Sequence, residues 1–566
     1  MYFNSQGEES ITYDAIVIGS GISGGFAAKE LCEKGLKTLV LERGKMIRHP
    51  DYPTANLDPW DFKYRDRLPA SELIDYPVQS RDGHVRESTR HLWVNDHENP
   101  YQEVKPFAWL RGYHVGGRSL MWGRQCYRWS DLDFEANARD GFGVDWPVRY
   151  ADIAPWYDYV ESFAGVSGAP EGLPQLPDGK FLPPMELNCV EQHLREQLQQ
   201  HYTDRVMTIG RAANLTQSLH GRGACQFRNR CNRGCPYGAY FSSNAATLPA
   251  AEATGNLTLR PHSIVHTILF DDETQRAAGV LVLDAEARTY HEYRARVIFC
   301  CASALGTTWI LLNSTSPRFP DGLGNDSGEL GHNLMDHHFK IGATGRIDGF
   351  DDKYYKGRRP NGTYLARFRN LDPKTPDSRF LRGYGYQGGA SRSNWMRSVR
   401  ELGIGAEIKD AMMEPGPWHM GLTGFGEMLP YHDNKVTLDT NKLDAYGLPT
   451  LAIDCEIKEN EHAMRKDMAE AAAEMLEACG FRDVHTYDSG YVPGLGIHEM
   501  GTARMGHDPK TSVVNKHNQL HAVRNVYVTD GAFMTSSACQ NPSITYMAFT
   551  ARAADHAVTS LKKGEL

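Results

Sequence analysis

The stretch YDAIVIGSGISGGFAAKELCEKGLKTLVLER, residues 13–43, constrains the fold of this chain more than any other. A short apolar run leads into a glycine-rich turn, a helix-like segment follows, and a second apolar run ends in the acidic residue Glu42. A lone glycine motif is often only a turn, but here both strands, the helix and the acid stand in the order that a dinucleotide site requires. The stretch therefore predicts a βαβ unit within an α/β fold.

The three glycines of this turn have different physical tasks. Gly19 allows the tight turn, Gly21 lets the backbone approach a pyrophosphate, and Gly24 lets the helix pack closely on the sheet. Phosphates are favoured at the helix N-terminus, and Glu42 is expected to accept hydrogen bonds from an adenosine ribose. This unit alone leaves NAD and FAD open.

The last 70 residues hold a second glycine-rich set. The block HEMGTARMG begins at His498, and NVYVTDG predicts a strand that runs into a turn at Asp530 and Gly531. The following NPSITYMAFTARAADHA predicts a helix with Pro542 in its first turn. The start of such a helix can direct its amide groups at an anionic ligand.

Two further motifs, VGGRSLMWG at 115–123 and GHNLMDHH at 331–338, complete a recognisable order. Together these motifs resemble the glucose-methanol-choline (GMC) oxidoreductases, which are FAD enzymes, over nearly the whole chain. The resemblance implies a Rossmann-like FAD-binding domain interleaved with an α+β substrate domain that contains an antiparallel sheet. The expected FAD-binding pieces are 1–50, 108–150, 205–330, which includes the cysteine loop 222–240, and 497–566; the expected substrate-binding pieces are 51–107, 151–204 and 331–496.

The resemblance also implies a catalytic pair, His498 and Asn541, facing the flavin. A neutral imidazole at His498 would take the hydroxyl proton of an alcohol while hydride moves to the flavin, and Asn541 would orient the substrate oxygen. The alternative is that His498 is an ordinary packed histidine. His337 and His338 fall in the family's N-L-x-D-H motif and are interpreted as structural.

Further contacts to the cofactor follow from the same resemblance. A histidine carries the flavin covalently in the related pyranose oxidases, but Met121 stands at that position, so FAD is expected to be non-covalent. The expected cofactor contacts beyond the first unit are Gly116, Gly117, Ser119, Trp122, Asp530, Gly531, Pro542 and Thr545.

Three of the eleven cysteines, Cys225, Cys231 and Cys235, follow C-x5-C-x3-C-P in an arginine-rich loop. A disulfide with one spare thiol, a zinc site and an iron–sulfur cluster are all open. Zinc normally takes four ligands, and no nearby fourth stands out, whereas three thiolates before a proline are typical of ferredoxin-type runs. The spacing is similar to that of catalytic subunits of multi-subunit bacterial GMC dehydrogenases for sugars, which implies a [3Fe-4S] cluster. The nearby Arg222, Arg228, Arg230 and Arg233 are expected to offset its charge, or else to form a solvated loop surface.

Within that group the chain is most similar to the large subunits of bacterial glucoside 3-dehydrogenases. This implies oxidation of C3 of glucose, glucosides or disaccharides, with a small partner subunit and a cytochrome c-type electron acceptor. Two alternatives are an oxygen-using sugar or C-glycoside 3-oxidase of the pyranose oxidase type and a non-catalytic flavoprotein that only relays electrons. Candidate sugar contacts, which are equally ordinary as loop residues, are Gln387, Trp418, His419, Glu427 and Tyr431.

Charge and hydropathy limit the partners and the location. The net charge of −9 and the absence of long like-charged runs make nucleic acid a poor partner. The start MYFNSQGEES lacks the features of a secretory signal, so the sequence by itself indicates the cytoplasm; the resemblance implies the periplasm, with export by a signal-bearing partner. The apolar stretch 297–312 is too short and too interrupted for a membrane span and predicts a buried strand running into a helix.

One helix of the substrate domain is clear from its periodicity. Apolar residues recur at helical spacing over 459–480, with Gly480 as the C-cap. This helix is expected to cover a sheet that includes KVTLDTN, residues 435–441.

Overall fold

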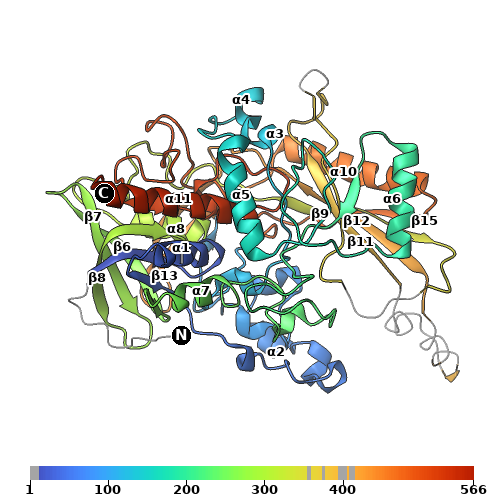
Figure 1. The fold of residues 1–566 in the computed structure, drawn as a ribbon, viewed down its shortest axis with the longest axis horizontal. Helices are drawn as coiled ribbons and strands as arrows, with labels where there is room; N and C mark the ends of the chain where they lie inside the picture. Colours follow the sequence, from blue (N-terminus) through green and yellow to red (C-terminus); the bar gives the residue numbers. More distant parts are fainter. Residues whose placement is uncertain (1–11, 354–358, 373–375, 393–404, 407–408, 410–414) are drawn as a thin grey trace.

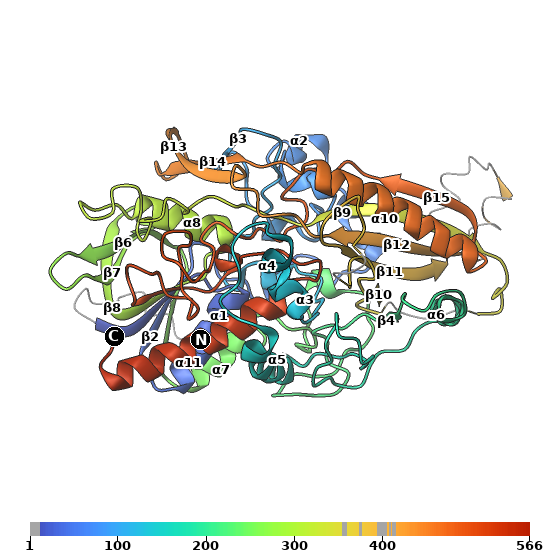
Figure 2. The same cartoon turned by 90° about the horizontal axis from the view of Figure 1, so that it is seen from above.

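The computed structural model describes residues 12–353, 359–372, 376–392, 405–406, 409 and 415–566. The N-terminal stretch MYFNSQGEES lies outside the described residues. Two large β-sheets, each covered by helices, make up the two halves of the molecule (Figures 1 and 2). The expected α/β fold with a second, antiparallel sheet is confirmed.

The first sheet has seven strands and contains the N-terminal βαβ unit. Its order is β5-β2-β1-β8-β7-β6, and β16 also pairs with β8. β5, β2, β1, β8 and β16 run parallel, whereas β7 and β6 are antiparallel to their neighbours. The strands are β1 Thr12–Ile18, β2 Thr38–Leu41, β5 Leu257–Arg260, β6 Ser263–Asp271, β7 Arg276–Asp284, β8 Tyr290–Cys300 and β16 Val526–Val528.

The second sheet is antiparallel, and a third, smaller sheet lies apart from it. The order of the six-stranded sheet is β15-β9-β12-β11-β10-β4, and that of the three-stranded sheet is β13-β14-β3. The strands are β4 Met207–Ile209, β9 His338–Ile347, β10 Thr363–Leu365, β11 Tyr384–Arg392, β12 Trp418–Gly426 and β15 Arg482–Asp488, then β3 Gln102–Glu103, β13 Lys435–Leu443 and β14 Pro449–Asp454.

Helices cover both large sheets (Figure 2). α1 packs on α7 and α11, α11 packs on α5, and α8 packs on β6 and β13. α10 packs on β9 and β15 of the second sheet. The helices are α1 Ile22–Glu33, α2 Ala70–Leu73, α3 Asp131–Phe134, α4 Ala136–Asp140, α5 Tyr150–Ala164, α6 Cys189–His201, α7 Thr247–Ala253, α8 Ala304–Asn313, α10 Glu459–Ala478 and α11 Ser543–Lys563.

Most local predictions match the observed elements. The apolar stretch 297–312 forms the end of β8 and most of α8, and the helix over 459–480 is α10. Gly480 follows α10 with a φ of +85°, the left-handed conformation that ends helices with glycine. The strand and the helix expected near the C-terminus are β16 and α11, and Pro542 caps α11.

Three placements differ from the sequence-based interpretation. KVTLDTN forms β13 in the three-stranded sheet, so the expected packing of α10 on that strand is wrong. β4 falls in the segment 205–330 but pairs with β10 of the second sheet. α5 falls in the segment 151–204 but packs on α11. Each placement depends on contacts between segments that are far apart in the sequence. The periodicity within a segment does not identify its partner in the fold.

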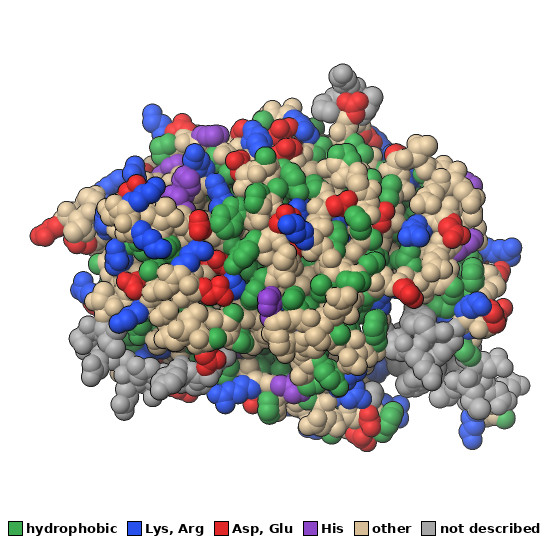
Figure 3. Space-filling model, in the orientation of Figure 1, with side chains coloured by type: hydrophobic (Ala, Val, Ile, Leu, Met, Phe, Trp, Pro, Cys, Tyr) green, Lys and Arg blue, Asp and Glu red, His purple; other side chains and the backbone are tan. Residues whose placement is uncertain are grey.

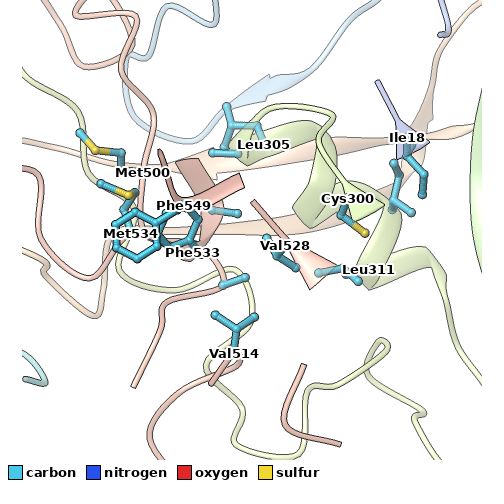
Figure 4. Close-up of a cluster of buried hydrophobic side chains, with 14 of the residues drawn as sticks. Ile18, Cys300, Leu305, Leu311, Met500, Val514, Val528, Phe533, Met534 and Phe549 are labelled. Atoms are coloured by element: carbon cyan, nitrogen blue, oxygen red, sulfur yellow. The ribbon is translucent and has the colours of Figure 1, made fainter. Parts of the chain in front are cut away.

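The core joins the first sheet to the C-terminal segment (Figure 4). Cys300 is fully buried in it, as expected of a cysteine in a strand core. The labelled side chains come from β1, β8, β16, α8, α11 and the loops between them: Ile18, Cys300, Leu305, Leu311, Met500, Val514, Val528, Phe533, Met534 and Phe549. Burial of this apolar surface ties the two ends of the chain together.

The surface seen in Figure 3 carries lysine, arginine, aspartate and glutamate side chains in mixed positions. No extended field of one charge is visible on that face. Among the described helices, none combines the length and the apolar character needed to cross a bilayer.

Candidate active site

A cavity of about 560 Å³ opens at the carboxyl ends of the parallel strands of the first sheet. Its lining includes residues that directly follow β1, β2 and β8, and single side chains from β9, β11 and β12 of the second sheet. Cofactors bind in α/β folds at this edge of the sheet, and the volume falls within the usual range of about 300–1,000 Å³ for small-molecule pockets. The cavity is therefore the candidate active site.

The glycine-rich turn between β1 and α1 forms one wall. Gly19 has a φ of +94°, and a Cβ on Gly24 would lie 1.9 Å from the carbonyl oxygen of Gly19. A Cβ on Gly21 would meet no atom within 4 Å. Gly21 caps α1 without a side-chain hydrogen bond, and it lines the cavity. Bare backbone at a helix start that faces a cavity fits a pyrophosphate.

Glu42 directly follows β2 and lines the same cavity. Its carboxylate accepts hydrogen bonds from the backbone N–H and hydroxyl of Ser20, at 3.1 and 2.6 Å, and from the N–H of Gly44 at 3.0 Å. Burial raises the pKa of Glu42, and these donors oppose that effect. Oε1 accepts only one of these bonds, so it keeps a lone pair that can accept a hydrogen bond from a ribose hydroxyl.

The segment 115–123 crosses in front of the turn. Gly117, Ser119 and Trp122 line the cavity, as does Met121. Trp122 is held by a hydrogen bond of 2.9 Å from its indole Nε1 to the carbonyl of Phe241. Gly116 does not line the cavity: a Cβ there would lie 2.3 Å from Asn244 Oδ1, and its N–H donates to Ser20 Oγ. Gly116 thus allows close packing behind the wall.

The C-terminal turn supplies the next wall. Asp530 and Gly531 line the cavity, and Asp530 accepts hydrogen bonds from Thr307 Oγ1 at 2.5 Å and from the N–H of Ala532 at 3.0 Å. Burial raises the pKa of Asp530 to about 6.

The first turn of α11 departs from the expectation. Pro542 and Thr545 do not line the cavity; Thr545 Oγ1 instead lies 2.8 Å from the hydroxyl of Tyr157 on α5. Ser543 and Tyr546 line it in their place. These two are three residues apart and share a helix face, a periodicity that could have identified them from the sequence.

His498 and Asn541 lie together in the cavity, where Asn541 Nδ2 is 3.5 Å from His498 Nε2. Asn541 Oδ1 accepts a hydrogen bond of 2.6 Å from Gln387 Nε2 on β11. On the far side of its ring, His498 Nδ1 is 2.8 Å from His337 Nδ1. Burial lowers the pKa of His498 well below its usual value, and His337 and Arg118 act in the same direction. The His498 ring is therefore neutral near pH 7.

Gln387 is the one predicted sugar contact that lines the cavity. Trp418 points into the core under the second sheet and donates from Nε1 to the carbonyl of Phe350 at 3.2 Å. Glu427 is completely buried and accepts a hydrogen bond of 2.7 Å from Arg382. Neither side chain lines the cavity, and both are buried inside the protein, so these two predicted sugar contacts are corrected to buried packing residues.

His419, another predicted sugar contact, lies outside the cavity lining for a different reason. Along β12, side chains alternate between the two faces of the sheet, and Phe425 from the cavity-side face lines the cavity. His419 shares that face but lies six residues earlier, about 20 Å along the strand. Tyr431, also outside the lining, donates to Glu461 at 3.0 Å.

An aromatic wall of the cavity is absent from the sequence-based predictions. Phe339 and Phe425 come from the adjacent strands β9 and β12, and their ring centroids are 5.1 Å apart in a stacked arrangement. Both line the cavity, and Gln125 and Asn232 line it as well. Phe339 directly follows the stretch GHNLMDHH, residues 331–338, which is the local sequence signal for it.

Cys225, Cys231 and Cys235 are partly buried, unpaired thiols in one loop. Burial raises the pKa of Cys225, and the neighbouring Cys231 and Cys235 raise it further. Within the described ranges, no three His, Cys, Asp or Glu side chains are arranged as a metal-binding group. Thiolates are ligands that suit a soft metal. The three thiols, however, are not arranged as a ligand set in this structure.

The arginines of this loop are engaged with protein groups. Arg222 donates to the carbonyls of Phe163 and Ala164, and Arg233 donates to the carbonyl of Thr54. Arg230 pairs with Asp58 at 3.1 Å. Their first role is thus to anchor the loop to the rest of the chain, rather than to surround the thiols.

Comparisons with known proteins point to one family. Two family models, both described as GMC oxidoreductase, match residues 13–339 and 430–550. The 2-methyl-1,2-propanediol dehydrogenase of Mycolicibacterium austroafricanum is 28% identical over 561 residues, which cover 96% of this chain and 94% of that protein. The fructose dehydrogenase large subunit of Gluconobacter japonicus is 23% identical and covers 98% of this chain, with 99% of its own length matched.

A solved structure shares the fold. The crystal structure of pyridoxine 4-oxidase from Mesorbium loti superposes with a TM-score of 0.61 and 17% identity, covering 96% of this chain and 98% of that one.

Proposed function

The chain belongs to the GMC oxidoreductase family, and from that premise we propose that it is an FAD-dependent sugar dehydrogenase. It acts on the CH–OH group of an alcohol. Its proposed substrates are glucose, glucosides or disaccharides, and its product is the 3-keto sugar. One observation supports the proposal most strongly. The neutral His498 and Asn541 line the same cavity as the glycine-rich dinucleotide motif.

Different residues of the cavity have different proposed roles. FAD, when bound, supplies an acceptor for the hydride of the alcohol carbon. The glycine-rich turn and Glu42 would hold its dinucleotide part. His498 Nε2 takes the hydroxyl proton as the carbon is oxidised, and Asn541 Nδ2 donates a hydrogen bond to the same oxygen. The buried surroundings exclude water and keep the imidazole unprotonated.

The cavity wall favours a carbohydrate within the alcohols. Phe339 and Phe425 present aromatic surface, and Gln387, Gln125 and Asn232 add amide groups that both donate and accept hydrogen bonds. Sugars combine apolar C–H faces with many hydroxyls, so a wall with both features suits them. The likeness to a fructose dehydrogenase large subunit supports a sugar substrate.

Anaerobic mixing of the FAD-loaded enzyme with methyl glucoside tests the proposal. The flavin absorbance should bleach, and analysis of the product should place the new carbonyl at C3. His498→Ala should slow the bleaching by about 10²-fold or more, which is the usual contribution of a positioned base. His485→Ala, an exposed histidine on β15, serves as the matched control and should leave the rate unchanged.

Two results would count against the proposal. No bleaching with any glucoside would remove the substrate assignment. Bleaching at the wild-type rate in His498→Ala would remove the proposed base and would favour a flavoprotein that only relays electrons.

We further propose that electrons leave through a [3Fe-4S] cluster held by Cys225, Cys231 and Cys235. Two observations support it: the three thiols share one loop, and Asn232 of that loop lines the cavity. Because the thiols do not form a ligand set as they stand, the loop would have to close around the iron. Iron and acid-labile sulfide should be present in anaerobically purified enzyme and absent from Cys231→Ser. Sugar-dependent peroxide formation by iron-free enzyme would favour the alternative, an oxygen-using sugar 3-oxidase.

The cellular setting is part of the same proposal. We propose export to the periplasm with a signal-bearing small subunit, and a cytochrome c-type protein as the electron acceptor. The support is the likeness to a protein described as a large subunit. Co-purification of a small subunit from the native host and sugar-dependent reduction of cytochrome c would test it. A cytoplasmic location of the active enzyme would contradict the export proposal.

A further inference from the structure

We propose that His337 is a positioning residue that holds His498 in the tautomer with an unprotonated Nε2 facing the cavity. From the sequence, His337 was interpreted as structural. The inference rests on the proposed function, in which His498 is the base, and it adds what prepares that base before the substrate binds.

The hydrogen bonds of His337 determine the positions of its protons. His337 Nε2 lies 3.1 Å from the carbonyl oxygen of Ser537, which can only accept, so this nitrogen carries a hydrogen. A neutral imidazole has one N–H, so His337 Nδ1 is an acceptor. The atom opposite it, at 2.8 Å, is His498 Nδ1, which must therefore donate. The remaining nitrogen of His498, Nε2, is left unprotonated.

The opposite side of His498 leads to the same assignment. Asn541 Oδ1 is occupied by the hydrogen bond from Gln387, so its Nδ2 faces His498 Nε2. An amide nitrogen only donates, and an unprotonated imidazole nitrogen only accepts. Both neighbours of His498 therefore require the same tautomer.

Burial keeps both rings neutral. Burial lowers the pKa of His337 to about 4, and it lowers the pKa of His498 as well. Burial and the nearby Glu499 raise the pKa of Asp336 to about 7, and Arg118 is ion-paired with Glu499 at 2.6 Å. The charged or titratable groups packed around the pair are Arg118, Asp336, His338, Glu499 and Tyr546.

The segment that carries His337 also positions the backbone of His498. Asp336 accepts hydrogen bonds from the N–H groups of Gly494, Gly496 and His498, at 2.7, 2.9 and 2.9 Å. Two adjacent residues thus hold the chain and the ring of His498. A base held in this way loses little conformational freedom when the alcohol binds.

The contact also acts during proton transfer. When the O–H bond of the alcohol breaks, the proton forms an N–H bond at His498 Nε2, and the ring becomes an imidazolium. Its Nδ1–H remains donated to the lone pair of His337 Nδ1, which stabilises the positive charge. Because this acceptor is neutral, it favours the imidazolium less than a carboxylate would.

Two substitutions separate this role from a merely structural one. His337→Leu removes the acceptor, so His498 can also adopt the tautomer with Nε2–H. His337→Asp replaces the neutral acceptor by a carboxylate. His338→Leu is the matched control, because His338 is also buried in the same motif, but the ring contact to His498 Nδ1 comes from His337.

The first readout needs no turnover. Diethyl pyrocarbonate acylates an unprotonated imidazole nitrogen, so its rate of reaction at His498 against pH, mapped by peptide mass spectrometry, reports the state of Nε2. In the FAD-loaded wild type, the reaction should persist below pH 6.5 and fall only at lower pH. His337→Leu should slow it at all pH values, and His337→Asp should move the midpoint up by about one pH unit or more.

The second readout is the rate of flavin bleaching by methyl glucoside. His337→Leu should lower this rate by about 10²-fold, and His337→Asp should move the acidic limb of its pH profile upward. His338→Leu should change neither readout.

Three results would overturn the inference. An unchanged acylation profile in His337→Leu would do so, and so would equal effects of His338→Leu and His337→Leu. If His337→Leu does not fold, an unchanged midpoint in His337→Asp would overturn it. Failure of the wild type to bleach with any alcohol would instead remove the proposed function, while the acylation profile would still report the tautomer.

Discussion

Two glycines of the glycine-rich motif at residues 19–24, Gly21 and Gly24, illustrate how single residues serve different purposes in one motif. Gly24 lies against the backbone of Gly19, whereas Gly21 faces open space in the cavity. Because backbone atoms cannot move aside as a flexible side chain can, Gly24→Ala should prevent α1 from packing on β1. Gly21→Ala should leave the fold intact and place a methyl group where the pyrophosphate would lie.

The two variants should therefore fail differently. Gly21→Ala should keep the wild-type melting temperature without cofactor and bind FAD about tenfold more weakly or worse, equivalent to about 1.4 kcal/mol. Gly24→Ala should be insoluble or melt far lower. Fluorescence titration with FAD and thermal melts of the apoprotein measure both. Equal FAD affinity in Gly21→Ala and the wild type would show that no phosphate approaches this backbone.

At the scale of elements, the contact between β12 and α10 depends on a missing side chain. A Cβ on Gly424 would lie 2.9 Å from Met468 Sδ and 3.3 Å from the carbonyl oxygen of Ile341. Gly424→Ala should lower the free energy of unfolding by about 1–3 kcal/mol through overpacking. Met468→Ala should cost about 2–5 kcal/mol through a cavity.

The double variant tests whether the two residues share one space. Because the Met468 truncation makes room for the new methyl group, the double variant should lose less than the sum of the two single losses. Gly421→Ala, on the same strand with no atom within 4 Å of an added Cβ, should change stability little. Denaturant midpoints measure each variant, and strict additivity would contradict the proposed contact.

At the scale of the whole molecule, a buried ionic network joins the second sheet to the rest of the chain. Arg382, which precedes β11, donates to Glu427 at 2.7 Å and to Asn137 of α4 at 2.8 Å. It also pairs with Asp140 of the same helix. Asn137 in turn donates to the carbonyl of Thr535 near the C-terminus, at 3.0 Å.

Removing one partner should leave an uncompensated buried charge. Glu427→Ala should lower the free energy of unfolding by about 3–5 kcal/mol, and it should leave KM for the sugar unchanged because Glu427 does not line the cavity. Glu135→Ala breaks the partly exposed pair with Arg139 and should cost less than about 1 kcal/mol. Thermal melts and steady-state kinetics measure both; a raised KM with unchanged stability would restore Glu427 as a sugar contact.

The range over which an interaction acts along the chain explains which predictions succeeded. The βαβ unit, the strand before α8 and helix α10 were predictable because glycine turns, apolar periodicity and helix caps act over a few residues. The motif order also predicted that both ends of the chain contribute to one cofactor domain. The strand partners of β4 and β13 were not predictable, since pairing depends on segments far away in the sequence.

The amino-acid sequence alone determined the dinucleotide turn and its acidic partner, because both belong to a short motif with its own chemistry. The pair of His498 and Asn541 came from the resemblance of the C-terminal motifs to those of a known family. Only the tertiary structure placed His337, 161 residues before His498, against its ring. The fold also placed Phe425 at the cavity and directed Trp418 and Glu427 away from it. The packing of a sheet determines which face and which end of each strand meet a cavity. The type of a residue does not by itself determine whether it reaches that cavity.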